Sequence, residues 1–475
     1  MSKREETLAK NTLVFAIGNI ASKLLQVLLV PFYTRVMTGE EFGTVDLLQA
    51  AVSLLLPISV LSIFESVFRF AMEKDCDRRA VLSIGLLFTA LGSAVMCLAG
   101  LVFQRFLDPL FVWLVIANTA ANALWTLVSQ YTKAVGKSGL FSAANVLMTF
   151  LVLLLNILFL VVFRMGVTGY MLGYTLSALL ATLFLIPFLG KDFAVGLGGV
   201  TSKLVKQMLF FSVPLVLNGI CWWISSFTDR IMITAFLGTE QNGIYAAASK
   251  VPNLLSVIAT IFYQAWQISA NEEFGQRDGA VFYSETFQRL SAVTFLLASG
   301  LTLFCRPINA VFLGAGFSSA WKLMPPLIIM TTCFAFCQFL NSVYSANKDT
   351  RMALVTNLIC VIVNVILNWF MIPRWGAYGA AVATAVSYVV LFAVRVIDTR
   401  RILPLRYDWG KILGCAALLL LQCIVLAVNL NVIFTYIISA VAFICVVLLY
   451  RKNLMELIRF AFGMLARIKN RRTKV

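Results

Sequence analysis

The chain has 475 residues, of which 61% are hydrophobic and only 12% are charged. Soluble globular domains carry about 25% charged residues, so this composition excludes an ordinary soluble protein and indicates an integral membrane protein. The formal net charge of +17 could suggest nucleic-acid binding, but no folded basic domain accompanies it, and we expect no nucleic-acid partner.

Apolar runs of the length that crosses a bilayer core, about 20 residues, recur along the whole chain. No segment shows the alternation with period two that an outer-membrane barrel requires. We therefore predict an all-α integral membrane protein with about 14 transmembrane helices. The predicted spans are residues 11–34, 43–68, 81–103, 109–132, 139–163, 168–189, 207–237, 242–270, 284–305, 318–345, 352–373, 376–398, 411–428 and 432–450.

Lysine and arginine are distributed unequally over the predicted loops. The N-terminus, the even-numbered loops and the C-terminal tail together hold 26 of them, whereas the odd-numbered loops hold 5. Basic residues are retained on the cytoplasmic side of a membrane, so we predict that both termini are cytoplasmic. The basic tail at 467–474 is expected to contact anionic headgroups.

Two short phrases occur twice in the chain. Residues 40–43 read Glu-Glu-Phe-Gly, and residues 240–243 repeat the Glu-x-x-Gly pattern 200 positions later. The Arg-x-Gly-x-x-Gly phrase at 164–169 recurs at 374–379, offset by 210. Membrane chains built from two similar halves usually bind a substrate between the halves, so the repeat favours transport.

The repeat also predicts the organisation of the chain. We expect two pseudo-symmetric six-helix lobes, followed by two further transmembrane helices and a basic tail. The predicted parts are an N-terminal lobe with its linker at 1–200, a C-terminal lobe at 201–400, the two extra helices at 401–450 and the tail at 451–475.

Histidine is absent from the chain, which removes the commonest general base and metal ligand. The external loop at 306–320 holds no carboxylate, whereas a membrane polymerase or transferase needs acidic residues to activate a hydroxyl or hold a metal. Cys333 and Cys337 share a helix face, but no His or third thiol accompanies them. We expect no catalytic residue, no metal site and no cofactor, and we predict that the protein is not an enzyme.

Polar side chains form stripes on several predicted spans. Such stripes are either interhelical hydrogen bonds that hold the bundle together or the wall of a wet cavity. Both interpretations fit the asparagines of 139–163 and 352–373 equally well. The stripe on 242–270 crosses most of the bilayer and favours a cavity wall. We select Asn122, Trp222 and Asn253 from these stripes as candidate substrate-binding residues.

Lys23, Arg230 and Lys250 lie inside predicted spans. A lone charge at the bilayer centre costs about 2.5 to 3.5 kcal/mol on insertion scales. These cations are therefore expected to line a water-filled interior and to meet an anionic substrate.

Arg69 is a further candidate for the cavity, although Glu65 lies one turn before it and could neutralise it at the helix end. Asp229, next to Arg230, is a candidate both for substrate binding and for ion coupling, and Glu65 is a second coupling candidate.

Several of these segments together are similar to bacterial polysaccharide flippases. That family belongs to the superfamily of multidrug, oligosaccharidyl-lipid and polysaccharide exporters, which includes the lipid II flippase. The resemblance covers nearly the whole chain and rests on Asn11, Thr12, Gly18, Asn19, Lys23 and residues 31–43, 238–247 and 364–384.

The resemblance implies a V-shaped pair of lobes, a central cationic cavity and alternating access in the bacterial cytoplasmic (inner) membrane. The implied substrate is a glycan on undecaprenyl diphosphate, whose phosphates would meet Lys23, Arg230 and Lys250. These cations are fewer than the arginines of the lipid II type, which favours another lipid-linked oligosaccharide. The other expected partners are membrane lipids and glycan-assembly proteins, and the protein is expected to be a monomer.

Two other functions stay open at this stage. A cation-coupled exporter of drugs or metabolites needs a carboxylate that titrates inside the membrane, and Asp229 is the deeply placed candidate. A membrane glycan polymerase is disfavoured by the short external loops and by the absent histidine.

Overall fold

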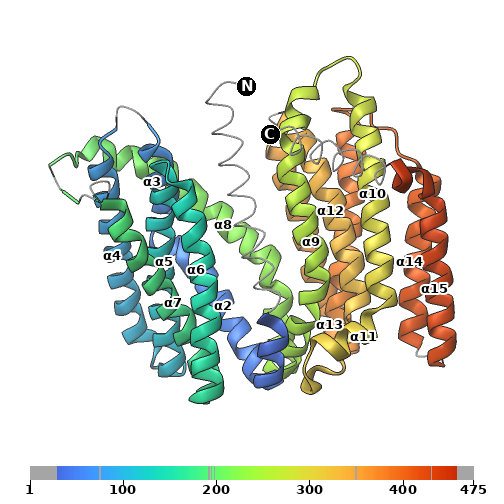
Figure 1. The fold of residues 1–475 in the computed structure, drawn as a ribbon, viewed down its shortest axis with the longest axis horizontal. Helices are drawn as coiled ribbons and strands as arrows, with labels where there is room; N and C mark the ends of the chain where they lie inside the picture. Colours follow the sequence, from blue (N-terminus) through green and yellow to red (C-terminus); the bar gives the residue numbers. More distant parts are fainter. Residues whose placement is uncertain are drawn as a thin grey trace, which may run out of the picture. The chain divides into compact units, whose positions relative to one another are not determined.

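The computed structural model describes residues 29–73, 76–190, 193, 195–196, 198–347, 350–428 and 431–456. This part of the chain is helical and contains no strand (Figure 1), which confirms the predicted all-α membrane fold. Ten of its helices are long and apolar enough to cross a membrane, or eleven if the bent pair α10 and α11 forms one span. The number fourteen stays a prediction, since most of the expected span 11–34 lies outside the described residues.

Contacts divide the chain into two compact units. Unit 1 comprises Met1–Ile231 and Thr239–Gly243, and unit 2 comprises Met232–Gly238 and Ile244–Val475. The lobe boundaries predicted from the sequence stay a prediction.

Unit 1 is a helical bundle in which α5 packs against α2, α3, α4 and α7, and α6 packs against α7. Its elements are α2 (Gly39–Ser59), α3 (Ile63–Ala71), α4 (Arg78–Phe103), α5 (Pro109–Ala134), α6 (Ser138–Asn156), the π-helix η1 (Ile157–Val162), α7 (Gly166–Leu189) and most of α8 (Ser202–Leu237). Its core is formed by buried aliphatic and aromatic side chains that include Val67, Leu127, Tyr131 and Leu185.

Unit 2 contains most of α9 and all the helices that follow it. Its elements are α9 (Thr239–Glu273), α10 (Gly279–Leu303), α11 (Cys305–Phe312), the short turns η3 (Ala315–Phe317) and η4 (Ala320–Lys322), α12 (Met324–Ala346), α13 (Thr350–Thr399), α14 (Trp409–Val428) and α15 (Val432–Leu449). Aromatic rings dominate its core, where Trp266 stacks on Phe339 with ring centroids 5.1 Å apart and Tyr283 meets Trp266 edge-on.

Local sequence explains where several helices begin. Thr38 and Glu41 form a capping box at the start of α2, in which each side chain accepts a backbone N–H that the helix leaves unpaired. Asp108 caps α5 ahead of Pro109, and Asn431 caps α15 in the same way. These caps fix the first residue of each helix, which hydrophobicity alone locates only to within several residues.

The predicted span 43–68 is broken in two. Leu61 and Ser62 adopt left-handed backbone angles, with φ of 52° and 50°, and separate α2 from α3. Pro57 lies just before this break and removes a backbone donor from the helix. By contrast, Pro325 and Pro326 lie inside the predicted span 318–345 without breaking a helix. They occupy the first turn of α12, where a missing N–H costs nothing.

The Arg-x-Gly-x-x-Gly repeat forms the same corner in each unit. Gly166 and Gly376 adopt left-handed backbone angles, with φ of 52° and 61°, which glycine reaches without strain. A Cβ atom on Gly169 would lie 3.2 Å from the carbonyl oxygen of Phe159, and a Cβ atom on Gly379 would lie even closer to the carbonyl oxygen of Met371. The phrase therefore encodes a tight turn of two packed helices.

The two C-terminal helices α14 and α15 lie side by side at the edge of unit 2 and pack against α10 (Figure 1). Gln422 of α14 is fully buried at this junction. Its Oε1 atom accepts a hydrogen bond from Ser299 of α10 at 3.0 Å, and its Nε2 atom donates to the carbonyl oxygen of Ser439 of α15 at 2.9 Å. One side chain thus joins all three helices.

Replacing Gln422 with leucine should lower the free energy of unfolding by about 1 to 2 kcal/mol, because Ser299 loses its acceptor and Ser439 its donor in a dry interface. The measurement is denaturant unfolding of the purified protein in detergent. Leu420 on the exposed face of α14 provides a matched control, and Leu420→Ala should change stability far less. Equal effects of the two substitutions would contradict this role.

Candidate functional site

The two copies of the Glu-x-x-Gly phrase meet within unit 1, at the N-terminal ends of α2 and α9. A Cβ atom on Gly43 would collide with the carbonyl oxygen of Thr239, and a Cβ atom on Gly243 would collide with that of Gly39. Only glycine lacks this atom, so only glycine lets the two backbones approach so closely. We call this contact of Gly39, Gly43, Thr239 and Gly243 the glycine crossing.

Three polar contacts continue from the glycine crossing along α2. They join Asn242 Nδ2 to the carbonyl oxygen of Gly43 at 3.1 Å, Arg230 Nη1 to Asp46 Oδ1 at 2.8 Å, and Trp223 Nε1 to the carbonyl oxygen of Ala50 at 2.8 Å. Positions 43, 46 and 50 are spaced by three and four residues and therefore share one face of α2. We call these three contacts the polar seam.

The Asp46–Arg230 ion pair is the centre of the polar seam and is largely shielded from solvent. The exposed fractions of the two side chains are 9% for Asp46 and 16% for Arg230. The Arg230 guanidinium also lies over the Phe227 ring, 5.0 Å from its centroid. The second carboxylate oxygen of Asp46 is buried and accepts no hydrogen bond from the described residues. Arg230 therefore gives this shielded carboxylate an ion-pair partner, and loss of that partner would be costly.

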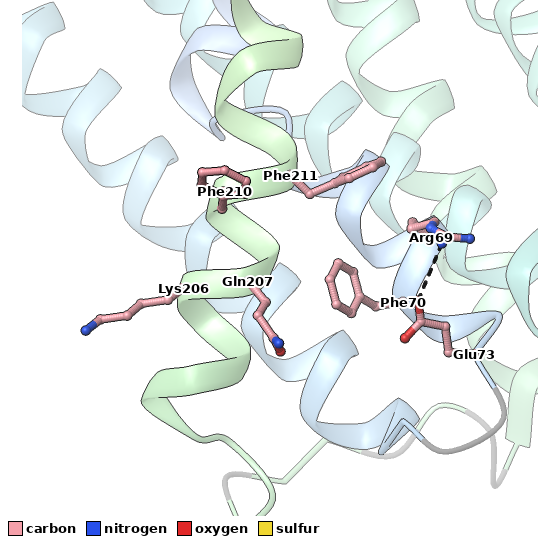
Figure 2. Close-up of a pocket in the computed structure, with 7 residues that line it drawn as sticks. All are labelled: Arg69, Phe70, Glu73, Lys206, Gln207, Phe210 and Phe211. Carbon is pink, nitrogen blue, oxygen red and sulfur yellow. Dashed lines mark ion pairs between the residues drawn. The ribbon is translucent and has the colours of Figure 1, made fainter.

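Away from the polar seam, the N-terminal part of α8 packs against α3. The Ser66 hydroxyl donates to the carbonyl oxygen of Met208 at 2.6 Å, and the rings of Phe70 and Phe211 meet edge-on with centroids 6.4 Å apart. A pocket of about 670 Å³ opens beside these contacts (Figure 2). Its lining residues are Arg69, Phe70, Glu73, Lys206, Gln207, Phe210 and Phe211.

The asparagine stripes of unit 1 make internal hydrogen bonds. Asn118 donates to the Thr175 hydroxyl at 3.1 Å, and Asn122 donates to both the backbone and the side-chain oxygen of Asn118 at 2.9 Å. Asn156 donates to the Tyr33 hydroxyl at 2.8 Å. The bonds of Asn118 and Asn156 join different helices and agree with the interpretation of the stripes as interhelical hydrogen bonds, whereas the bonds from Asn122 to Asn118 lie within α5.

The candidate residues fall in different places. Lys23 and the side chain of Trp222 lie outside the described residues. Asp229 and Arg230 are half-buried on α8, and Glu65 is half-buried on α3, where Arg69 forms its ion pair with Glu73 at 3.8 Å.

Lys250 and Asn253 are half-buried on α9 in unit 2, and Asn122 belongs to unit 1. The convergence of all these residues on one cavity therefore stays a prediction. Within unit 1, the pocket residue Lys206 and the seam residue Arg230 are separated by about 36 Å along α8, at 1.5 Å per residue. The pocket and the polar seam are two separate places.

Sequence reasoning missed several residues that the structure places in these contacts. Asp46, Trp223 and Asn242 form the polar seam, and Lys206 lines the pocket. The one available signal was the spacing of Trp223 and Arg230 by two full helical turns, which puts both on one face of α8.

Arg395 on α13 was given no role and is 3% exposed. Its guanidinium donates to the carbonyl oxygen of Cys337 at 2.7 Å and to the side chains of Asn357 and Thr356 at 3.0 and 3.2 Å. This buried cation ties α12 to both ends of α13 and serves the packing of unit 2.

Comparison with known families gives two matches. A family model described as polysaccharide biosynthesis protein matches residues 8–267, which is more than half of the chain, and the MatE model matches residues 214–370. Among curated proteins, the probable low-salt glycan biosynthesis flippase Agl15 of Haloferax volcanii is 23% identical over 86% of this chain and 87% of its own length. The probable multidrug resistance protein YoeA of Bacillus subtilis is also 23% identical, over 43% of this chain and 46% of its own length.

Solved structures show the same fold. The lipid II flippase MurJ in an inward closed conformation matches with a TM-score of 0.69 and 13% identity, covering 93% of this chain and 99% of its own. An inward-facing multidrug resistance MATE transporter of the MOP superfamily matches with a TM-score of 0.63 and 14% identity, covering 82% of this chain and 94% of its own. At these identities the likeness concerns the fold alone.

Proposed function

Because this chain belongs to the polysaccharide biosynthesis protein family of the MOP superfamily, we propose that it is a flippase for a lipid-linked glycan. In this proposal, it moves a polyprenyl-diphosphate-linked oligosaccharide from the inner to the outer leaflet of the bacterial cytoplasmic membrane. The observation that carries the proposal is how much of this chain aligns with each curated relative. The curated relative named as a glycan flippase aligns over 86% of this chain, and the one named for multidrug resistance aligns over 43%.

The glycine crossing supports a mechanism of alternating access. Two helix ends whose closest contacts are between backbone atoms at glycine can separate without unpacking large side chains. The polar seam holds the crossing closed, because a shielded ion pair and two hydrogen bonds to backbone oxygens lie next to it along α2. Transport of a headgroup past this point requires the crossing to open.

The unequal loop charges support cytoplasmic termini, so the glycine crossing, at the junctions after spans one and seven, faces the outside. The crossing then closes the external path while the substrate loads from the cytoplasm. We keep the monomeric state and the glycan-assembly partners as parts of the same proposal.

A drug or metabolite exporter is the second candidate, and the MatE match at 214–370 favours it. Cation coupling needs a carboxylate that exchanges its ion during the cycle. Asp46, the carboxylate of the polar seam, is held by Arg230 at 2.8 Å. That pairing opposes ion exchange at Asp46 while the crossing is closed.

Deletion of the gene should deplete the surface glycan and leave drug susceptibility unchanged. Lectin staining of the cell surface measures the first, and growth across a panel of toxic cations measures the second. The chain expressed from a plasmid should restore the glycan. A deletion strain with normal surface glycan and increased drug susceptibility would favour the exporter instead.

A further inference from the structure

The pocket between α3 and α8 carries cations on two sides. Figure 2 shows Arg69 and Lys206 on opposite sides of the pocket, with Phe70 and Gln207 between them. Arg69 comes from the last turn of α3, and Lys206 from the second turn of α8. Both side chains are exposed, so their charged ends can turn toward a ligand that enters between them.

The frame of the pocket is fixed by contacts that need no ligand. The Ser66 hydroxyl donates to the Met208 carbonyl oxygen at 2.6 Å, and both residues are fully buried. The Phe70 and Phe211 rings add an edge-on contact directly at the pocket wall. Because α3 and α8 are joined in this way, the pocket exists before a ligand binds, which lowers the cost of binding.

The charges in the pocket favour an anion. Two cations and one carboxylate line the pocket, and the Lys206 side chain is directed away from Arg69 and Glu73 (Figure 2). Glu73 lies 3.8 Å from Arg69 in a pair whose side chains are 62% and 46% exposed. Such an exposed pair holds its partners weakly, about 0 to 1 kcal/mol. A phosphate group can replace Glu73 as the partner of Arg69, since guanidinium binds phosphate through two parallel hydrogen bonds. The Gln207 amide offers a further donor.

The remaining lining favours a ligand that also carries an apolar chain. Three phenylalanines line the pocket, and Phe210 is 85% exposed. Helix segments that bind at the boundary of headgroups and hydrocarbon combine lysine with apolar side chains such as phenylalanine. A small soluble phosphate would make no use of these rings, whereas the chain of a lipid would cover them.

We propose that this pocket binds the phosphate group of a lipid at the membrane surface. Arg69, Lys206 and Gln207 would hold the phosphate, and Phe70, Phe210 and Phe211 would contact the first part of the chain. An anionic phospholipid and a polyprenyl carrier share this chemistry. In the second case, the pocket is the loading site for the substrate, and to that extent the inference rests on the proposed function.

Native mass spectrometry of the full-length protein in detergent tests the proposal with three probes: undecaprenyl phosphate, phosphatidylglycerol and inorganic pyrophosphate. Removing one interfacial cation should weaken lipid binding about fivefold, and Arg69→Ala with Lys206→Ala should weaken it about 25-fold. Phe210→Ala should weaken binding of the two lipids and leave pyrophosphate unaffected. Lys203→Ala is the matched control, because Lys203 is an equally exposed lysine one turn earlier on α8 that does not line the pocket.

Tighter binding of undecaprenyl phosphate than of phosphatidylglycerol would identify the carrier as the occupant, and equal binding would identify a general lipid site. Either result supports lipid binding in this pocket, provided that the double variant no longer binds the lipid. Unchanged lipid binding by the double variant, an equal loss in Lys203→Ala, or equally tight binding of pyrophosphate would overturn the proposal. A wild-type protein that binds lipid here but restores no surface glycan would contradict the proposed function and leave the pocket standing.

Discussion

Replacing Gly43 with alanine should reduce surface-glycan export at least tenfold, because the added Cβ atom collides with the carbonyl oxygen of Thr239. A backbone atom cannot turn aside as a side chain does, so the two helix ends must move apart. Overpacking of this kind costs about 1 to 3 kcal/mol, and at this position the cost falls on the closed crossing. The measurement is lectin staining of a deletion strain that expresses the variant.

Gly139→Ala is the control for this experiment. Gly139 lies in the first turn of α6, and a Cβ atom there would meet nothing within 4 Å. Alanine should be neutral or slightly stabilising at this position, since it favours the helix. Gly243→Ala should repeat the Gly43→Ala phenotype, because its Cβ atom meets the carbonyl oxygen of Gly39. Full export by both crossing variants would show that the closed crossing is not needed.

The second large effect is expected at the Asp46–Arg230 ion pair. Removing one partner of a shielded pair leaves an uncompensated charge, which costs about 3 to 5 kcal/mol. We therefore expect Arg230→Met to lower the free energy of unfolding by that amount and to reduce export. Asp46→Asn combined with Arg230→Met should cost less than Arg230→Met alone, because no buried carboxylate remains. Denaturant unfolding in detergent measures both.

Arg289→Ala provides the matched control, because Arg289 pairs with Glu285 at 3.5 Å in an exposed position on α10. That pair should contribute about 0 to 1 kcal/mol. Similar losses for the Arg230 and Arg289 variants would mean that the seam pair is not shielded in the membrane. A double variant less stable than Arg230→Met would contradict the assignment of Asp46 as the destabilising charge.

The sequence predicted the helices well because spans are set by hydrophobic length, which is a local property. Their internal breaks were harder to predict. The left-handed residues Leu61 and Ser62 carry no glycine signal, so Pro57 was the local sign in the expected span 43–68 of its division into α2 and α3. A proline pair such as Pro325 and Pro326 is compatible with a break inside a helix and with the start of one. The structure shows a start, because the short turns η3 and η4 come directly before α12.

The candidate site was harder because its contacts join distant parts of the chain. Arg230 was selected as a charge that needs explanation, but its partner Asp46 is 184 positions away and looks like an ordinary carboxylate near a helix start. Trp222 was chosen from a polar stripe, while the hydrogen bond to α2 comes from Trp223. One residue is a rotation of about 100° around a helix, and an apolar span gives little information to fix that angle.

The glycine crossing has a consequence for hybrid proteins. Each glycine makes room for a backbone segment from the other copy of the repeat, Gly43 for Thr239 and Gly243 for Gly39. The two copies are therefore a matched set, and neither can be exchanged on its own for a segment with a side chain at that position. A chimera that joins residues 1–200 to the second half of a relative should assemble only if that relative also has glycine at the position of Gly243.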